Sequence, residues 1–460
     1  MTWDMGARVT LRLAGTWIAT LFAPLLAAAP VGAAVSILPD STVQDVWRLD
    51  NGLKVVVHHI STTHHVAMTL VWPTGSDADP PGQTGHAALL AELEFTGAAG
   101  DIPERTRAEM ATIRPAGWAA ACSPRATQLT EIATLPQFPG ALHQFATRLR
   151  GVTVSDASLT RAIASLRSDL DARRRPTSNV ELYGAVRDLA RGSWNPDDAD
   201  AGLRALARVR PAQLQAELAR TFTPARAVLS LAGNLSGINL HSLIQNEFGG
   251  IPAGAKVADP PVAKLSPASR TIPRKGLQQP AGVVGVLAPA LDDTLQPSFY
   301  FATLMFATSL PKEWGSPTAP LTSRFQFSLF DDPEMVRFYP PPDTGSSGGN
   351  DAGLENRVDT AARNLAAMII PPDADAAVIR ATSWLLGGSM PPEILGRAAR
   401  DPSVLATVAL NQGVRELWGG EPFWSEYRRR FMTYGHAYDY WLDWLLNRNH
   451  RVELVLTPAK

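Results

Sequence analysis

Apolar and polar positions alternate in several short segments of the chain. Alternation around Asn51-Gly52 predicts a β-hairpin over residues 46–58, because Asn-Gly favours the tight turn of a hairpin. A strand pair is expected within 117–135, and further strands are expected at 66–72, 227–232, 281–288 and 451–456. Both halves of the chain therefore begin with a strand and close on one, which predicts an α+β fold of two related units.

Other segments carry apolar residues at helical spacing. The clearest is 155–175, where Leu159, Ile163, Leu166 and Leu170 fall on one face. Residues 85–97 predict a short apolar helix, entered through a Pro/Gly loop and closed by a glycine. Near the C-terminus, aromatic residues recur every three or four positions, which indicates a helix core or, alternatively, an association surface: Trp424, Tyr427, Phe431, Tyr434, Tyr438, Trp441 and Trp444.

The N-terminal segment 1–34 has the pattern of a signal peptide, with Arg8 and Arg12 before an apolar run and small residues at its end. We therefore expect a periplasmic or secreted protein, anchored in the membrane if the segment stays uncleaved. Prolines crowd residues 251–273 without periodicity, which predicts a linker. The linker would separate an N-terminal domain, 41–250, from a C-terminal domain, 274–460.

Composition narrows the function classes. The net charge of −1 gives no reason to expect a nucleic-acid partner. The one cysteine, Cys122, cannot form an intrachain disulfide, and we interpret it as a small buried side chain rather than a nucleophile. Four histidines, at 58, 59, 64 and 65, surround a hairpin end, where they could bind a metal or simply face solvent.

Several segments, in their order and spacing, resemble the pitrilysin/insulinase metallopeptidase family, which includes the processing-peptidase subunits. They are Leu49 to Val57, Gly75-Ser76, Gly85-His86-Ala87, Phe95-Thr96-Gly97, Ala116-Gly117-Trp118, Leu135-Pro136, Leu231 to Asn234 and Phe248 to Pro252. The resemblance covers nearly all of the chain after the signal segment. It implies two domains, each an antiparallel sheet packed with helices.

That family binds zinc through His-x-x-Glu-His on the helix that corresponds to 85–97, and a later Glu completes the ligands. The register set by Gly85-x-Ala87 and Phe95-x-Gly97 places the two histidine positions at Ala88 and Glu92 and the catalytic glutamate position at Ala91. The later helix offers Ser168 and Asp169. Zinc is therefore not expected, no catalytic residue is assigned, and His86 is interpreted as a partly exposed residue at the helix start.

The resemblance also implies a peptide-binding role for an edge strand, by strand addition. In this sequence the strand is 118–123, with Trp118, Ala120 and Cys122 as candidate contacts. Family members hold substrate with an Arg and a Tyr in the second half, and Arg337 and Tyr339 could form a displaced pair. A glycine-rich loop of the non-catalytic processing-peptidase subunit would correspond to 311–320, whereas the Gly/Ser run here is at 345–349.

The sequence thus predicts an exported, non-catalytic family member. It would form a heterodimer with an active zinc peptidase of the family and help to bind peptide substrate. One alternative is a stand-alone peptide-binding or scaffold protein of the same fold. Another is an active hydrolase that uses other residues.

Overall fold

The computed structural model describes residues 44–173, 180–192, 194, 198–255, 258–277, 281–313, 325–339, 379, 382, 386, 390–433 and 437–459. Three features expected from the sequence lie outside these ranges. They are the signal peptide, most of the loop at 311–320 and the Gly/Ser run.

The first sheet has six strands in the order β1-β2-β6-β3-β5-β4. The predicted hairpin is present, with Gln44 opposite His58 and Arg48 opposite Lys54. β2 and β6 are parallel and the other neighbouring strands are antiparallel. The strands are β1 (Gln44–Arg48), β2 (Lys54–His59), β3 (His65–Trp72), β4 (Trp118–Cys122), β5 (Thr127–Thr134) and β6 (Val228–Gly233).

The second sheet has five strands in the order β7-β11-β8-β10-β9. Its closing strand, β11, is parallel to β7 and antiparallel to β8, just as β6 is parallel to β2 and antiparallel to β3. This repeat of topology agrees with two related α+β units. The strands are β7 (Ala268–Arg274), β8 (Ala281–Leu287), β9 (Phe325–Ser328), β10 (Asp332–Phe338) and β11 (Arg451–Pro458).

The α+β prediction is confirmed, and the expectation of wholly antiparallel sheets needs one correction. Each sheet contains one parallel pair because the closing strand returns after a helical crossover long enough to reverse direction. The helices are α2 (His86–Thr96), α3 (Arg107–Ile113), α4 (Phe138–Arg150), α5 (Asp156–Arg173), α6 (Val180–Ala190), α7 (Asp198–Leu206), α8 (Pro211–Thr221), α9 (Leu240–Phe248), α10 (Gln296–Glu313), α13 (Pro392–Ala398), α14 (Pro402–Leu417), α15 (Gly420–Met432) and α16 (Ala437–Leu446).

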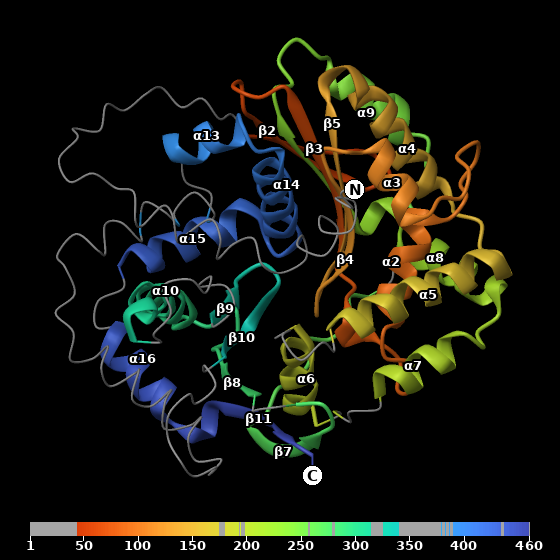
Figure 1. The fold of residues 1–460 in the computed structure, drawn as a ribbon. Helices are drawn as coiled ribbons and strands as arrows, with labels where there is room; N and C mark the ends of the chain where they lie inside the picture. Colours follow the sequence, from red (N-terminus) through yellow and green to blue (C-terminus); the bar gives the residue numbers. More distant parts are fainter. Residues whose placement is uncertain are drawn as a thin grey trace, which may run out of the picture.

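Two helices cross between the halves. α14 comes from the second half but covers β3, β5 and β6 of the first sheet, whereas α6 comes from the first half and packs on β8 and β11 (Figure 1). Gly413 allows the close approach of α14, because a Cβ there would lie 2.9 Å from a methyl carbon of Val71. The first sheet is therefore buried on both faces, with Met68 and Leu70 in one core and Ala67 and Val71 in the other.

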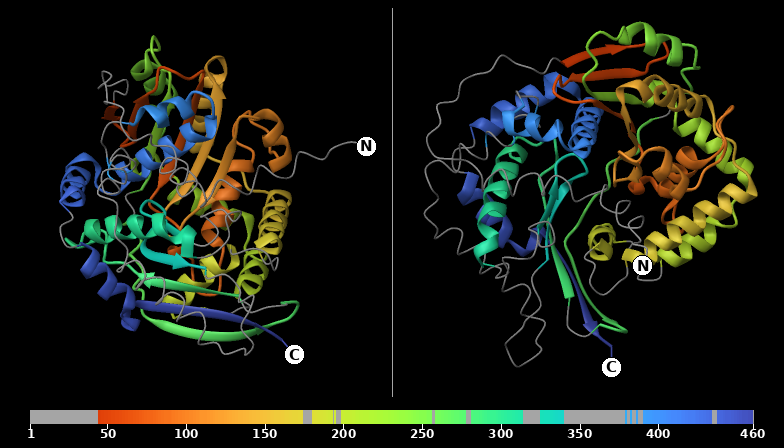
Figure 2. Two further views of the ribbon diagram at one scale, coloured as in Figure 1. Left: turned by 60° about the vertical axis from the view of Figure 1, so that its left-hand side comes forward. Right: turned by 45° about the horizontal axis from the view of Figure 1, so that its top comes forward.

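The expected linker is only partly irregular. Residues 251–255 and 258–267 carry no helix or strand, but 268–273 belong to β7. The strand lacks an apolar pattern because it lies at the sheet edge, where Pro273 and exposed polar side chains are tolerated. Among the described strands it pairs with β11 alone. Both views in Figure 2 show β7 beside β11 at one end of the molecule.

The C-terminal aromatic residues form helix core where the structure describes their side chains. Trp424, Tyr427 and Phe431 on α15 and Trp441 on α16 are buried, and Trp444 is partly buried against the same core. Across the described ranges, none of the helices has the length and apolar character needed to cross a membrane.

Candidate functional site

The α2 helix lies where the sequence predicted it, and its ends are fixed by glycines. Gly85 has φ of +93°, a left-handed conformation that glycine adopts without strain. The carboxylate of Asp79 accepts hydrogen bonds from the backbone N–H groups of Gly85 and Ala87, both at 2.7 Å. These bonds satisfy donors that the first helical turn leaves free. α2 is buried nearly all round, which accounts for its almost uniformly apolar sequence.

The three motif positions carry no zinc-binding chemistry. Ala91 is buried and Ala88 is partly buried, and their methyl groups can neither ligate a cation nor accept a proton. Glu92 is also buried, and its carboxylate faces Arg107 at the start of α3. The motif helix therefore presents one carboxylate where the register places a histidine.

Arg107 holds Glu92 and Asp169 together. Its Nε and Nη2 donate to the Glu92 carboxylate at 2.8–3.1 Å, and its Nη1 donates to Asp169 at 2.8 Å. Burial lowers the pKa of Arg107, but the carboxylates of Glu92 and Asp169 outweigh it and raise that pKa above its ordinary value. A permanent guanidinium thus bridges the position of the second histidine and the helix that would supply the third ligand.

These residues do not fit a zinc ion. A metal bound between Glu92 and Asp169 would meet the positive charge of Arg107 at hydrogen-bond distance from both carboxylates. Among the described residues, no group of three or more His, Cys, Asp or Glu side chains could hold a metal ion. The four histidines of the hairpin end form no such group there.

His86 differs from its expected environment. It is only 6% exposed, and its Nε2 lies 3.0 Å from a carboxylate oxygen of Glu217 on α8. Contact with His86 lowers the pKa of Glu217. The expectation of a partly exposed residue is wrong because α8 packs over the start of α2, a contact between segments 130 residues apart that local sequence does not reveal.

The candidate strand β4 does lie at an edge of the first sheet. Trp118 is buried, with its ring stacked on Phe95 of α2 at 5.1 Å, whereas Ala120 and Cys122 are partly buried. Burial raises the pKa of the Cys122 thiol well above its ordinary value, which argues against a cysteine nucleophile. Among the described strands, none pairs with the outer side of β4, and peptide binding by these three residues stays a prediction.

Arg337 and Tyr339 are buried rather than presented at a surface. Arg337 is 1% exposed, contacts Asp332 and donates to the Tyr183 carbonyl at 3.1 Å. Its guanidinium carbon also lies 3.8 Å from the centroid of the Tyr183 ring. The expected substrate-holding pair is therefore not open to a ligand here, because Arg337 fixes α6 against β10.

Sequence reasoning missed an ion-pair network between the halves. Arg187 on α6 contacts Asp332 and donates to Asp77 at 2.6 Å, and its Nη2 lies 3.5 Å from Glu334. Burial raises the pKa of Asp332, but Arg187 and Arg337 hold it below its ordinary value. No local motif marks Arg187, since all three of these acidic partners are more than 100 positions away from it.

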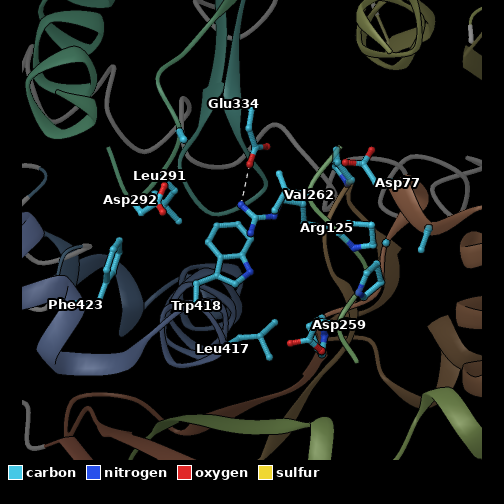
Figure 3. A pocket seen from close by; sticks show the side chains of 17 residues that line it. Asp77, Arg125, Asp259, Val262, Leu291, Asp292, Glu334, Leu417, Trp418 and Phe423 are labelled. Carbon is cyan, nitrogen blue, oxygen red and sulfur yellow. Dashed lines mark hydrogen bonds and ion pairs between the residues drawn. The ribbon is translucent and has the colours of Figure 1, made fainter. Parts of the chain in front are cut away.

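Beside this network lies a cavity of about 450 Å³. Its walls come from both halves, and they include Asp77 and Arg125 from the first half and Glu334 and Trp418 from the second (Figure 3). The Arg125 guanidinium lies over the Trp418 ring, 4.8 Å from its centroid, and donates to Glu334 at 2.7 Å.

Comparison with known proteins agrees with this fold. Residues 208–326 match the family model described as the peptidase M16 inactive domain. A protease from Helicobacter pylori superposes with a TM-score of 0.71 at 13% identity, covering 91% of this chain and all of that one. A peptidase M16 inactive domain from Pseudomonas fluorescens superposes with a TM-score of 0.60 at 15% identity. This alignment covers 91% of this chain and 98% of that domain.

The chain has the fold of the M16 peptidases. The resemblance to the pitrilysin/insulinase family is thereby confirmed, and the family model that matches residues 208–326 describes an inactive domain. The periplasmic protease PqqL from Escherichia coli is also similar, with a TM-score of 0.62 at 14% identity, and the alignment covers 93% of this chain but 48% of PqqL. No curated protein matches the sequence.

Proposed function

We propose that this protein is an exported, catalytically inactive M16-type protein that pairs with an active zinc peptidase of the family and helps to bind its peptide substrate. The observation that carries the proposal is the cluster at α2. Ala88 and Ala91 supply no ligand or base, and Arg107 occupies the carboxylates of Glu92 and Asp169. No zinc is expected in the purified protein.

Peptide binding rests on the edge position of β4 in the first sheet. Among the described strands β4 pairs with β5 alone, and an edge strand satisfies the backbone groups of an extended peptide. Export rests on the pattern of residues 1–34, and the similar PqqL is described as periplasmic.

Co-purification from the native host tests the pairing. We expect a relative that contains an intact His-x-x-Glu-His motif to co-purify, and peptidase activity to be higher with both chains than with the relative alone. Isolation of this protein alone, with peptide binding retained, would favour a stand-alone binding protein. Peptide cleavage by the isolated protein with stoichiometric zinc would overturn the proposal.

A further inference from the structure

The cavity between the halves begins where the edge strand ends. Pro124 and Arg125 directly follow β4 and Ser123, and both line the cavity. A peptide added to β4 and continuing past Cys122 would therefore reach this cavity with its next residues. The position connects the cavity with the proposed peptide-binding edge.

The walls of the cavity are acidic. Four carboxylates, from Asp77, Asp259, Asp292 and Glu334, line it together with one cation, Arg125. Asp77 and Glu334 are already paired with Arg187. Asp259 is 67% exposed at 3.3 Å from Arg226, and Asp292 makes no hydrogen bond or ion pair within the described part of the chain. Carboxylate charge therefore remains available to a ligand.

The cavity already holds one guanidinium. That of Arg125 lies over the face of Trp418 and against Glu334, and its side chain is 21% exposed. An aromatic face beside a carboxylate is an arrangement that binds organic cations, and arginine in particular. Figure 3 shows the Arg125 guanidinium beside the Trp418 ring, with a dashed line that joins it to Glu334.

We propose that this cavity binds the arginine side chain of an extended peptide added to β4, and that Arg125 occupies the site until such a peptide displaces it. This inference rests on the proposed peptide-binding function and names the side chain that the peptide must carry. Displacement would also break the contacts by which Arg125 joins the β4–β5 turn to β10 and to the end of α14.

Calorimetric titration with two peptides tests the inference. The peptides share a Ser/Thr/Val sequence and differ only in one residue near one end, arginine or its neutral isostere citrulline. We expect the arginine peptide to bind about tenfold more tightly than the citrulline peptide. Arg125→Ala should increase affinity for the arginine peptide about tenfold and leave the citrulline peptide unchanged, whereas Arg208→Ala, at an exposed site away from the cavity, should change neither.

The outcomes separate the two proposals. If neither peptide binds any variant, peptide binding fails and this inference fails with it. If both peptides bind equally well to the natural protein and to Arg125→Ala, peptide binding stands and the arginine site is overturned. Asp292→Asn is a second variant that removes no hydrogen bond or ion pair among the described residues, so it should fold. It should weaken only the arginine peptide, and equal affinity for both peptides would again overturn the site.

Discussion

Arg107 and Arg187 each hold several carboxylates, but Arg107 joins elements of one half whereas Arg187 joins the two halves. Arg107 is 28% exposed and contacts Glu92 and Asp169. Arg187 is 4% exposed and contacts Asp77 from the first half and two acids of β10. The more deeply buried cluster around Arg187 should therefore control how the two halves dock. The more exposed cluster around Arg107 should control the chemistry at α2.

Removal of Arg187 should give the largest loss of stability. Arg187→Met would leave Asp77 and Asp332 buried with fewer positive partners, at a cost of about 3–5 kcal/mol. Urea unfolding at neutral pH would measure this cost. Arg191→Met is the matched control, because Arg191 is 23% exposed and lies 3.4 Å from Asp77, so its loss should cost under about 1 kcal/mol. Equal effects of the two variants would contradict the contrast drawn between the clusters.

Stability should depend on pH, by contrast, where a buried carboxylate accepts no hydrogen bond from an arginine side chain. Glu94 is 3% exposed, and Arg148 donates to its backbone carbonyl. Burial raises the pKa of Glu94 to about 8, although the charge of Arg148 opposes the shift. The folded state therefore holds this proton more tightly than the unfolded state, so stability should fall as pH rises from about 4.5 to about 8.

Glu94→Gln should remove that fall because glutamine stays neutral. At pH 8.5 the variant should be more stable than the natural protein by about 2–4 kcal/mol, and at pH 4.5 the difference should nearly vanish. Chemical unfolding at several pH values would measure it. Other acids with raised pKa, among them Asp188 and Asp331 (each about 6) and Glu334 (about 7), are present in both proteins, so the difference isolates Glu94. A constant difference across pH would count against a protonated Glu94.

Local sequence predicted the parts of the fold that depend on local chemistry. Asn51-Gly52 marked the first hairpin, and Gly85 and Gly97 marked the ends of α2. The strand pair within 117–135 emerged as β4 and β5, with β4 at the edge. These features follow from turn residues and from apolar periodicity, which act over a few positions.

The remaining features depend on contacts between distant residues. Arg107 lies 15 positions from Glu92 and 62 from Asp169, so no spacing rule brings the three together. α14 covers a sheet formed by the other half, and β7 has no apolar pattern because it is an exposed edge strand. The motif register located the altered site, but only the fold reveals that a guanidinium fills it.

Removal of Arg107 should cost less than removal of Arg187. Arg107→Met would leave Glu92 buried and unpaired, but solvent reaches the guanidinium and reduces the penalty to about 1–2 kcal/mol. Urea unfolding beside Arg105→Met, a partly buried arginine in the loop two positions before Arg107, would measure it. A loss as large as that for Arg187→Met would show that exposure does not distinguish the clusters.

The same arginine should decide whether a restored motif can bind zinc. Ala88→His, Ala91→Glu and Glu92→His together rebuild His-x-x-Glu-His, with Asp169 as a further carboxylate. With Arg107 present we expect little zinc, because its guanidinium pairs with Asp169 and repels the cation. With Arg107→Ala added, metal analysis after dialysis should find about one zinc per chain. Equal zinc content in both proteins would show that Arg107 does not block the site.

Asp169→Asn should have the smallest effect on stability. Arg107 would lose one hydrogen bond, that of Nη1 at 2.8 Å, but would keep its bidentate contact with Glu92. Because Asp169 is 20% exposed, the expected cost is below about 1 kcal/mol. Glu92→Gln should cost more, since it breaks the bidentate pair and that side chain is 4% exposed. The order of the two variants in urea unfolding tests whether Glu92 is the main partner, because a larger effect of Asp169→Asn would place the anchor of Arg107 on α5 instead of α2.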